Sequence, residues 1–253
     1  CGWDGTGIGV AVLDSGVRQH NQMSLSDNVV YKESFVKSDS DPADDHGHGN
    51  HVAGIITADG SGGFHGIAPK AKLINLRVLD KNGKGTDSAV IAAIQRAIQL
   101  KNTYNIRVMN LSIGRPVVGS YTTDPLCQAV EAAWKAGIVV VVSAGNEGRN
   151  NSKGTYGYGT ISAPGNDPYV ITVGAMKPVA TPSRADDHVA SYSAKGPTLL
   201  DHVVKPDIVA PGNRIVSLRA WEGAMWNSYT GNRVGTEKYL LSGTSMAAPM
   251  VSG

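Results

Sequence analysis

Short apolar runs recur along the chain, and polar or glycine-rich stretches separate them. Runs of this length, rich in valine, isoleucine and leucine, are typical of strands that are buried on both faces of a sheet. They predict strands at residues 8–13, 73–79, 108–113, 138–142 and 170–173. The pattern therefore indicates a sheet whose strands lie mostly in the protein interior.

Helical patterns lie between the predicted strands. Residues 88–100 carry apolar side chains at every fourth position, which places them on one face of a helix. A second helix is predicted to begin at Asp124-Pro125, because aspartate caps helix N-termini and proline suits the first turn, and to end at Gly137. A third helical run covers residues 52–58. This alternation predicts an α/β fold of three layers, a mostly parallel β-sheet with helices on both faces.

Composition and length favour one compact domain. No repeat or low-complexity linker divides the 253 residues, so we predict a single domain over residues 1–253. A net charge of +2 is too small to indicate a nucleic acid or a membrane surface as partner, and no apolar run has the length of a membrane span. Cys1 and Cys127 are too few for a disulfide framework. Because the chain begins with Cys and carries no signal-type segment, we expect a piece of a longer protein, incomplete at both termini.

Polar residues lie at the ends of three of the predicted strands. They are Asp14, the segment Asn110-Leu111-Ser112-Ile113-Gly114 and the segment Ser143-Ala144-Gly145-Asn146. Such residues often only form turns. However, ligands of α/β sheets bind beyond the carboxyl ends of the strands. The coincidence of three polar segments at one sheet edge therefore favours a functional site there.

Ser245 is a candidate nucleophile. It lies among small residues at the start of an alanine-rich run that is predicted to be helical. A helix N-terminus would place unpaired N–H groups and a positive dipole beside its hydroxyl, where an oxyanion would form. Taken alone, such a run is more often a helix cap than a nucleophile. A serine nucleophile also needs a general base, and the base needs a group that orients it.

Three histidines, His46, His48 and His51, crowd one segment. His48 lies between two glycines before the predicted helix, so its ring can project from a helix start, whereas His51 also suits a hydrogen-bonded packing role. Metal ligands could have this spacing, which leaves a metallohydrolase as an alternative; Asn50 and the lack of a later ligand motif disfavour it. Asp14 ends an apolar strand, where an unpaired carboxylate is costly, so we expect a cationic or imidazole partner. Backbone N–H groups of its own turn are the alternative partners.

Four segments together resemble the motifs of the subtilisin-like serine proteases, the subtilase family. They are Asp14-Ser15-Gly16, His48-Gly49-Asn50-His51-Val52-Ala53-Gly54, Ser143-Ala144-Gly145-Asn146-Glu147-Gly148 and Gly243-Thr244-Ser245-Met246-Ala247-Ala248-Pro249. They follow one another in the order Asp, His, Ser of that family. The resemblance covers almost the whole chain. It implies a serine endopeptidase that hydrolyses peptide bonds of proteins through an acyl-enzyme.

The resemblance also implies residue roles. Ser245 is the nucleophile, His48 the general base, and Asp14 orients His48. Asn146 donates its side-chain amide to the oxyanion. The implied substrate-binding residues are Gly83, Lys84, Gly85, Ser112, Ile113 and Gly114 in two edge segments, and Ser143, Ala144, Gly145 and Ser162 in the walls of the specificity pocket. Their small side chains imply a roomy, mainly apolar pocket that favours large uncharged side chains before the cleaved bond, with Glu147 at its rim.

The family resemblance implies no cofactor for the chemistry. Residues 38–45 offer carboxylate ligands for a structural calcium ion, although a solvated acidic loop is the expected structure, and residues 59–63 lack the insertion that forms a strong calcium site in many relatives. Asn50 stands where the family usually has threonine, and we expect it to tune the activity rather than abolish it. The resemblance further implies protein or peptide substrates, a propeptide in the full-length protein, a monomer and an extracellular location.

Two other readings stay open. An esterase of the α/β-hydrolase type is disfavoured by the order of the motifs and by Ala247, which replaces the second glycine of its serine motif. A catalytically silent relative that serves as a binding domain is disfavoured because all four catalytic positions are filled. Since the helix after Ser245 is short, we expect this stretch alone to be poorly folded or inactive, while the whole protein is a protease.

Overall fold

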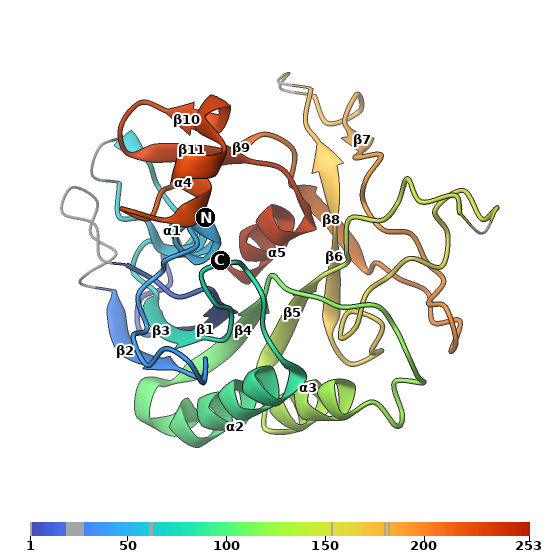
Figure 1. Cartoon of the computed structure of the whole chain (residues 1–253), viewed down its shortest axis with the longest axis horizontal. Helices are drawn as coiled ribbons and strands as arrows, with labels where there is room; N and C mark the ends of the chain where they lie inside the picture. The colour runs from blue at the N-terminus through green and yellow to red at the C-terminus, as the bar shows by residue number, and fades with distance from the viewer. Residues whose placement is uncertain (1, 19–27, 61–62, 153, 180, 182) are drawn as a thin grey trace.

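The central layer of the fold is a mostly parallel sheet (Figure 1). The computed structural model describes residues 2–18, 28–60, 63–152, 154–179, 181 and 183–253. The strands are β1 (Gly9–Asp14), β2 (Val29–Ser34), β3 (Lys72–Arg77), β4 (Ile106–Leu111), β5 (Val139–Ser143), β6 (Ile171–Lys177), β7 (His188–Val189) and β8 (Ile208–Pro211). Their order is β2-β3-β1-β4-β5-β6-β7, and β8 pairs with β6. The pairs are parallel except for β6 with β7.

Helices cover both faces of this sheet, as predicted. Figure 1 shows α2 (Asp87–Tyr104) and α3 (Pro125–Lys135) along one side, and α1 (His48–Thr57) and α5 (Thr244–Ser252) on the other. Alternate residues of β1 pack on opposite faces of the sheet. Ala11 and Leu13 pack in the core with α2 and α3, whereas Val10 and Val12 pack in the core with α1 and α5. This period of two buries both faces of the strand and explains its continuous apolar sequence.

The predicted strands and the two capped helices are present, with ends displaced by a few residues. Asp124 caps α3 as expected: its carboxylate accepts from the N–H of Leu126 at 2.9 Å, and Pro125 occupies the first turn. Gly137 follows the helix with a φ of 80°, a conformation that glycine adopts without strain. The capping residues in the sequence therefore predicted both ends of α3 correctly.

Helix α1 begins earlier than the sequence predicted. The prediction placed the helix at residues 52–58, whereas His48 is its first residue, so His48 lies inside the helix. The buried carboxylate of Asp44 explains the difference. It accepts from the backbone N–H groups of Gly47 at 2.7 Å and Asn50 at 2.8 Å, and so satisfies N–H groups that a helix start leaves unpaired. Gly47 turns the chain into the helix with a φ of 112°.

A small antiparallel sheet was not predicted. It consists of β9 (Ile215–Leu218), β10 (Arg233–Val234) and β11 (Lys238–Leu241) in the order β10-β11-β9. A short helix, α4 (Ala224–Ser228), and a 3₁₀ turn, η2 (Thr230–Asn232), join β9 to β10. This sheet lies beside α1 (Figure 1). In the part of the chain that the structure describes, no helix has the length and apolar character needed to cross a membrane.

An ion-pair network ties the loop after β4 to the starts of α2 and α3. The guanidinium of Arg115 donates to both oxygens of Asp124 at 2.7 Å and to the carboxylate of Asp87 at 2.8 and 3.1 Å. The side chain of Asp124 is only 2% exposed. Without Arg115 its charge would be buried and unpaired, which is costly. The network therefore fixes the loop that leads away from the edge of the sheet.

We expect Arg115→Ala to lower the free energy of unfolding by about 3 kcal/mol, because it leaves the Asp124 carboxylate buried without its partner. Chemical denaturation of the two proteins measures the difference. Lys135→Ala is the control, since the exposed Lys135–Glu131 pair is worth less than about 0.5 kcal/mol. Equal losses in the two variants would contradict the account of Arg115.

Candidate active site

The candidate catalytic residues lie where the strand ends meet the starts of two helices. Asp14 is the last residue of β1, and His48 is the first residue of α1. Ser245 is the second residue of α5, which packs beside α1, and Asn146 follows β5. The parallel sheet thus brings to one edge polar residues that are far apart in the sequence, as the rule for α/β sheets predicted.

Asp14 and His48 form a hydrogen-bonded pair. The Nδ1 atom of His48 lies 2.8 Å from Oδ1 and 3.0 Å from Oδ2 of Asp14, which is buried. Because a carboxylate only accepts, Nδ1 carries the proton, and in the neutral ring Nε2 keeps a lone pair. Burial lowers the pKa of His48, but the charge of Asp14 and its hydrogen bond outweigh burial and raise the pKa above its ordinary value.

The hydroxyl of Ser245 is directed at backbone in this structure. Its Oγ donates to the carbonyl of Ser112 at 3.1 Å, and the Ser112 hydroxyl donates to the carbonyl of Ser245 at 2.8 Å. This reciprocal pair holds the start of α5 against the end of β4. Donation from Ser245 to His48 therefore requires rotation of the serine side chain, a change expected on substrate binding because catalytic hydrogen bonds often tighten only in the complex.

The side-chain amide of Asn146 is oriented by the start of α5. Its Oδ1 accepts from the backbone N–H of Thr244 at 3.0 Å and from the Thr244 hydroxyl at 3.3 Å. Since a backbone N–H can only donate, the carbonyl of the amide must face Thr244, and Nδ2 points the other way. The N–H of Ser245, in the first turn of α5, has no acceptor within the helix. Two donors are thus left beside the serine.

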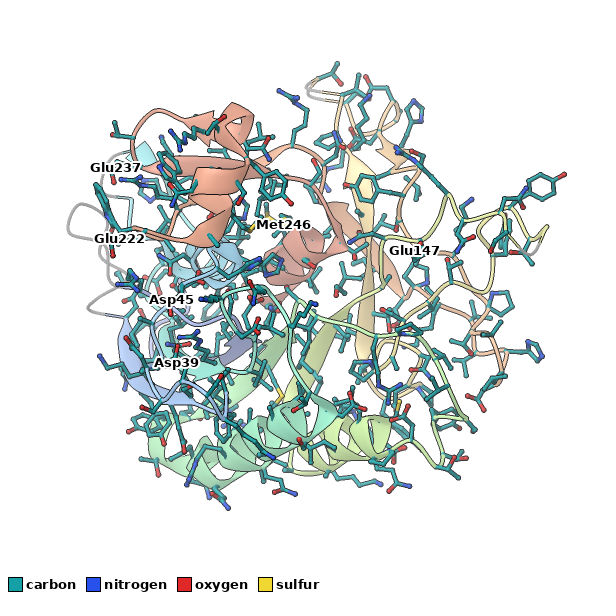
Figure 2. All side chains as sticks on the ribbon, viewed as in Figure 1. Asp39, Asp45, Glu147, Glu222, Glu237 and Met246 are labelled. Atoms are coloured by element: carbon teal, nitrogen blue, oxygen red, sulfur yellow. The ribbon has the colours of Figure 1, made fainter. Side chains whose placement is uncertain are left out.

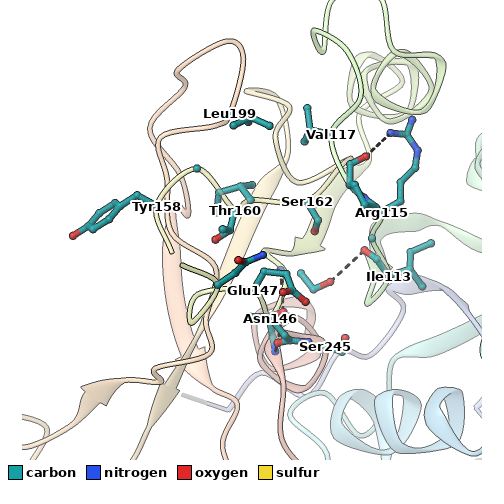
Figure 3. Close-up of a pocket in the computed structure, with 18 of the residues that line it drawn as sticks. Ile113, Arg115, Val117, Asn146, Glu147, Tyr158, Thr160, Ser162, Leu199 and Ser245 are labelled. Carbon is teal, nitrogen blue, oxygen red and sulfur yellow. Dashed lines mark hydrogen bonds between the residues drawn. The ribbon is translucent and has the colours of Figure 1, made fainter. Parts of the chain in front are cut away.

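A cavity of about 660 Å³ lies beside Ser245 (Figure 3). Six of the predicted substrate-binding residues line it: Ser112, Ile113, Gly114, Ser143, Gly145 and Ser162. Asn146 and Glu147 line it as well, and its outer wall includes Val117, Tyr158 and Leu199. Ala144 does not line the cavity, because its side chain is buried in a small apolar cluster behind it. The loops after β4 and β5 therefore form most of the walls, and Leu199 and the start of α5 complete them.

The hydroxyl of Ser162 lies between two glycines of the cavity wall. A Cβ atom at Gly114 would lie 2.5 Å from Ser162 Oγ, and one at Gly145 would lie 3.1 Å from it. The same hydroxyl donates to the carbonyl of Ala144 at 3.2 Å. A larger residue at Gly114 would therefore displace the Ser162 hydroxyl, and one at Gly145 would crowd it, so this hydroxyl limits the depth of the cavity at that point.

The other predicted edge segment lies outside this cavity. Gly83, Lys84 and Gly85 follow a turn after β3, in which the Asp80 carboxylate accepts from the N–H of Lys84 at 2.9 Å. A Cβ atom at Gly83 would lie 2.9 Å from the ring of His46. That ring has its centre 6.3 Å from the centre of the His48 ring. The segment therefore borders the histidine loop rather than the cavity.

His51 has the packing role that was one of its two predicted roles. Its Nε2 lies 3.1 Å from the carbonyl of Ile215 and 3.0 Å from that of Tyr239, so Nε2 carries the proton. Burial lowers the pKa of His51 to about 3, which keeps the ring neutral. Among the residues with a described position, no group of three His, Cys, Asp or Glu side chains could hold a metal ion. The geometry gives the histidine-cluster metallohydrolase no support.

The acidic stretch at residues 38–45 surrounds a guanidinium. Arg77, only 1% exposed, pairs with Asp39 and Asp45 at 3.1 Å each and donates to the carbonyls of Asp41 and Ala43 at 2.8 Å. Figure 2 shows Asp39 and Asp45 close together, on the side of the molecule away from Glu147. Ser38, Ser40 and Asp41 are exposed, which agrees with the expected solvated acidic loop, while the buried guanidinium of Arg77 pairs with two carboxylates of that loop. The second stretch considered for calcium, residues 59–63, lies partly outside the described residues.

Sequence reasoning missed Asp44 and Ser15, which join the strand of Asp14 to the helix of His48. The Ser15 hydroxyl donates to Asp44 Oδ1 at 2.8 Å and accepts from the N–H of Gly49 at 2.8 Å. Burial raises the pKa of Asp44 despite these hydrogen bonds. An aspartate just ahead of a predicted helix is a capping signal, and it could have identified Asp44 had the helix start been placed correctly.

Comparison with known proteins agrees with this geometry. Residues 5–253 match the sequence model of the subtilase family. The serine protease AprX of Bacillus subtilis (strain 168) is 40% identical over 257 residues, which cover 98% of this chain and 56% of AprX. Subtilisin DY of Bacillus licheniformis is 35% identical over 254 residues, covering 100% of this chain and 76% of subtilisin DY. The solved structure of the S41 psychrophilic protease has a TM-score of 0.77 at 30% identity, covering 98% of this chain and 75% of that one. The chain therefore spans little more than half the length of AprX.

Proposed function

Because the chain belongs to the subtilase family, we propose that it is the catalytic domain of a serine endopeptidase that hydrolyses peptide bonds of proteins. The observation that carries the proposal is the Asp14–His48 pair, 2.8 Å apart, at the sheet edge where Ser245 begins α5. Ser245 attacks the peptide carbonyl while Nε2 of His48 takes its proton. His48 then gives this proton to the departing amine, and an acyl-enzyme forms. Water then attacks the acyl-enzyme, with Nε2 of His48 again taking the proton, and His48 returns the proton to Ser245 as the carboxylic acid product leaves.

The role of Asp14 follows from the direction of its hydrogen bond. It holds the proton on Nδ1 of His48, so Nε2 is the basic atom. Its negative charge stabilises the imidazolium that forms when His48 takes the serine proton. The same charge opposes the effect of burial on His48, which would otherwise make the ring a weaker base.

Asn146 and the N–H of Ser245 stabilise the tetrahedral oxyanion. Both are donors whose positions are fixed by α5 before substrate arrives. Donors that are neutral and already in place act most strongly on charge that appears only in the transition state.

We expect Asn146→Leu to lower kcat by about 10²–10³, the range known for this donor in subtilisin, with little change in KM. Steady-state kinetics on a peptide substrate measure both constants. Asn102→Leu, on the exposed face of α2, is the matched control and should leave them unchanged. A loss of less than about threefold in Asn146→Leu would reject the donor role.

Substrate binds as an extended strand in this proposal. Ser112-Ile113-Gly114 and Gly83-Lys84-Gly85 supply backbone groups on its two sides, in the manner of strand addition. The side chain before the cleaved bond enters the cavity beside Ser245, whose walls include Ser143, Gly145 and Ser162. Small wall residues leave room for a large uncharged group.

A peptide library should therefore show the highest kcat/KM with large uncharged side chains directly before the cleaved bond. Ser162→Gly removes the hydroxyl between Gly114 and Gly145, so it should shift the preference further toward phenylalanine and tyrosine relative to alanine. A strict preference for small or acidic side chains in the unmodified protein would contradict the assignment of the cavity.

The proposed function is tested by casein hydrolysis by the full-length protein, with two inhibitors used separately. A serine-directed phosphonate should abolish hydrolysis, and a chelator should leave the chemical step intact. Inhibition by the chelator alone, with the serine unlabelled, would instead support a metallohydrolase. Absence of both hydrolysis and labelling would support the catalytically silent binding domain. A propeptide, a monomeric state and an extracellular location stay predictions of the family resemblance.

A further inference from the structure

Helix α4 is hydrogen-bonded to the segment that leads into His48. The backbone N–H of Ala224 donates to the carbonyl of Asp45, and that of Met225 donates to the carbonyl of His46, both at 2.9 Å. These two N–H groups belong to the first turn of α4 and have no acceptor within it. The carbonyls that they hold lie immediately before His48. The position of α4 therefore sets the position of this backbone.

A second contact reaches α1 just after His48. The carboxamide of Asn50 is buried, and its Nδ2 donates to the carbonyls of Arg219 and Arg18, both at 3.0 Å. Its Oδ1 accepts from the N–H of Arg18 at 2.6 Å. One side chain thus joins α1, the turn after Asp14 and the segment that precedes α4. Backbone on both sides of His48 is tied to residues 219–225.

Tyr239 of β11 contacts α4 near its start and just after its end. It is 3% exposed, and its hydroxyl lies 2.9 Å from the carbonyls of Met225 and Tyr229. Its ring packs on Trp226 with centres 5.9 Å apart. A helix as short as α4 is not stable alone, so its place depends on such contacts.

Two guanidinium groups and two indole rings complete the support of α4. Arg219 lies over Trp221 at 3.6 Å and over Trp226 at 4.1 Å, and Arg233 lies over Trp226 at 4.6 Å. Arg233 also donates to the carbonyl of Trp226 at 2.8 and 3.1 Å. A cation is attracted to the face of an aromatic ring, and most strongly when the pair is partly desolvated. Residues 219–239 are therefore held together by their own hydrogen bonds and cation–π contacts, and we call this segment the brace.

We infer that the brace positions His48 against Asp14, with Tyr239 and Arg233 as its positioning residues; this inference rests on the proposed function. Displacement of α4 moves the carbonyls of Asp45 and His46 and, with them, the first residue of α1. A shift of about 1 Å in a catalytic group is enough to cost 10²-fold in rate. The brace acts through His48 and does not touch the reacting atoms.

Tyr239→Phe tests this inference because it removes one hydroxyl and keeps the ring on Trp226. We expect kcat for a short peptide substrate to fall about fivefold with KM unchanged. We also expect the pKa of His48, followed by NMR in a Ser245→Ala background, to fall toward its ordinary value as the contact with Asp14 loosens. The titratable groups that surround His48 are Asp14, Asp44, His46 and His51, and the substitution alters none of them.

Arg233→Ala is the second variant, chosen because Arg233 is exposed and its loss leaves the core intact. It should change kcat and the pKa of His48 in the same direction. Tyr31→Phe is the matched control: its hydroxyl donates to Glu33 at 2.7 Å on β2, away from His48, so both readouts should stay unchanged.

Unchanged kcat and unchanged His48 pKa in both brace variants would overturn the inference, even if both proteins melt at lower temperature. The NMR titration does not depend on hydrolysis. If the unmodified protein proves inactive and unlabelled by phosphonate, the proposed function fails, while the titration still decides whether the brace positions His48.

Discussion

Replacing Ser245 by alanine is expected to lower kcat for peptide hydrolysis by about 10⁶, the loss known for removal of the nucleophile in subtilisin. The substitution removes the only atom that can form the acyl-enzyme in this account. His48→Ala should cause a similar loss, because an unactivated serine is a poor nucleophile. The double variant should be hardly worse than either single one, since the residues act as a unit. Steady-state kinetics on one peptide substrate measure all three.

Ser242→Ala is the matched control for this series. Ser242 is exposed, and its hydroxyl accepts from the N–H of Arg214 at 2.8 Å, so its loss should leave kcat unchanged. A Ser245→Ala protein that retains more than about one-hundredth of kcat would contradict the assignment of the nucleophile. Additive losses in the double variant would contradict the coupling of Ser245 with His48.

Asp14→Asn is expected to lower kcat by about 10⁴, because the amide no longer fixes the proton on Nδ1 of His48. It should also move the pH profile. His48 acts as a base only when neutral, and Asp14 raises its pKa, so the rise of kcat/KM in the unmodified protein should lie at higher pH than for an ordinary histidine, with activity that persists into the alkaline range. In the Asp14→Asn variant His48 is still buried, which lowers its pKa, but the charge of Asp14 that raised this pKa is absent. The acidic limb should therefore move to lower pH.

The pH dependence of kcat/KM in both proteins measures this shift. Asp4→Asn is the control, since the carboxylate of Asp4 pairs with Lys70 near the N-terminus and should not affect the profile. An acidic limb that stays in place or moves to higher pH would contradict the effect of Asp14 on His48. An acid optimum in the unmodified protein would contradict His48 as the base.

Much of the fold could be predicted from the sequence because its signals are local. Strands buried on both faces read as unbroken apolar runs, as residues 138–142 do for β5, and the cap at Asp124 fixes the start of α3. The four motifs also predicted the candidate catalytic residues, which the structure brings to one edge of the sheet. These features depend on neighbouring residues in the chain.

The features that sequence missed depend on distant residues. Helix α1 begins at His48 because Asp44 is buried against Ser15, a contact across the fold. The pairing of the acidic loop with Arg77 of β3 was missed because nothing in the loop's own sequence points to that residue. The strands of the small sheet have only two to four residues each, too few to show a clear period of two, and β9 has its place through packing against α1.

The most direct test of the central claim is the site at which a serine-directed phosphonate reacts. The protein is treated with the phosphonate, digested and analysed by peptide mass spectrometry, with His48→Ala as a parallel sample. The account predicts a single adduct on Ser245, loss of proteolysis in proportion to labelling, and no adduct in the His48→Ala protein. Proteolysis that continues with Ser245 unlabelled, or an adduct on another residue, would contradict it.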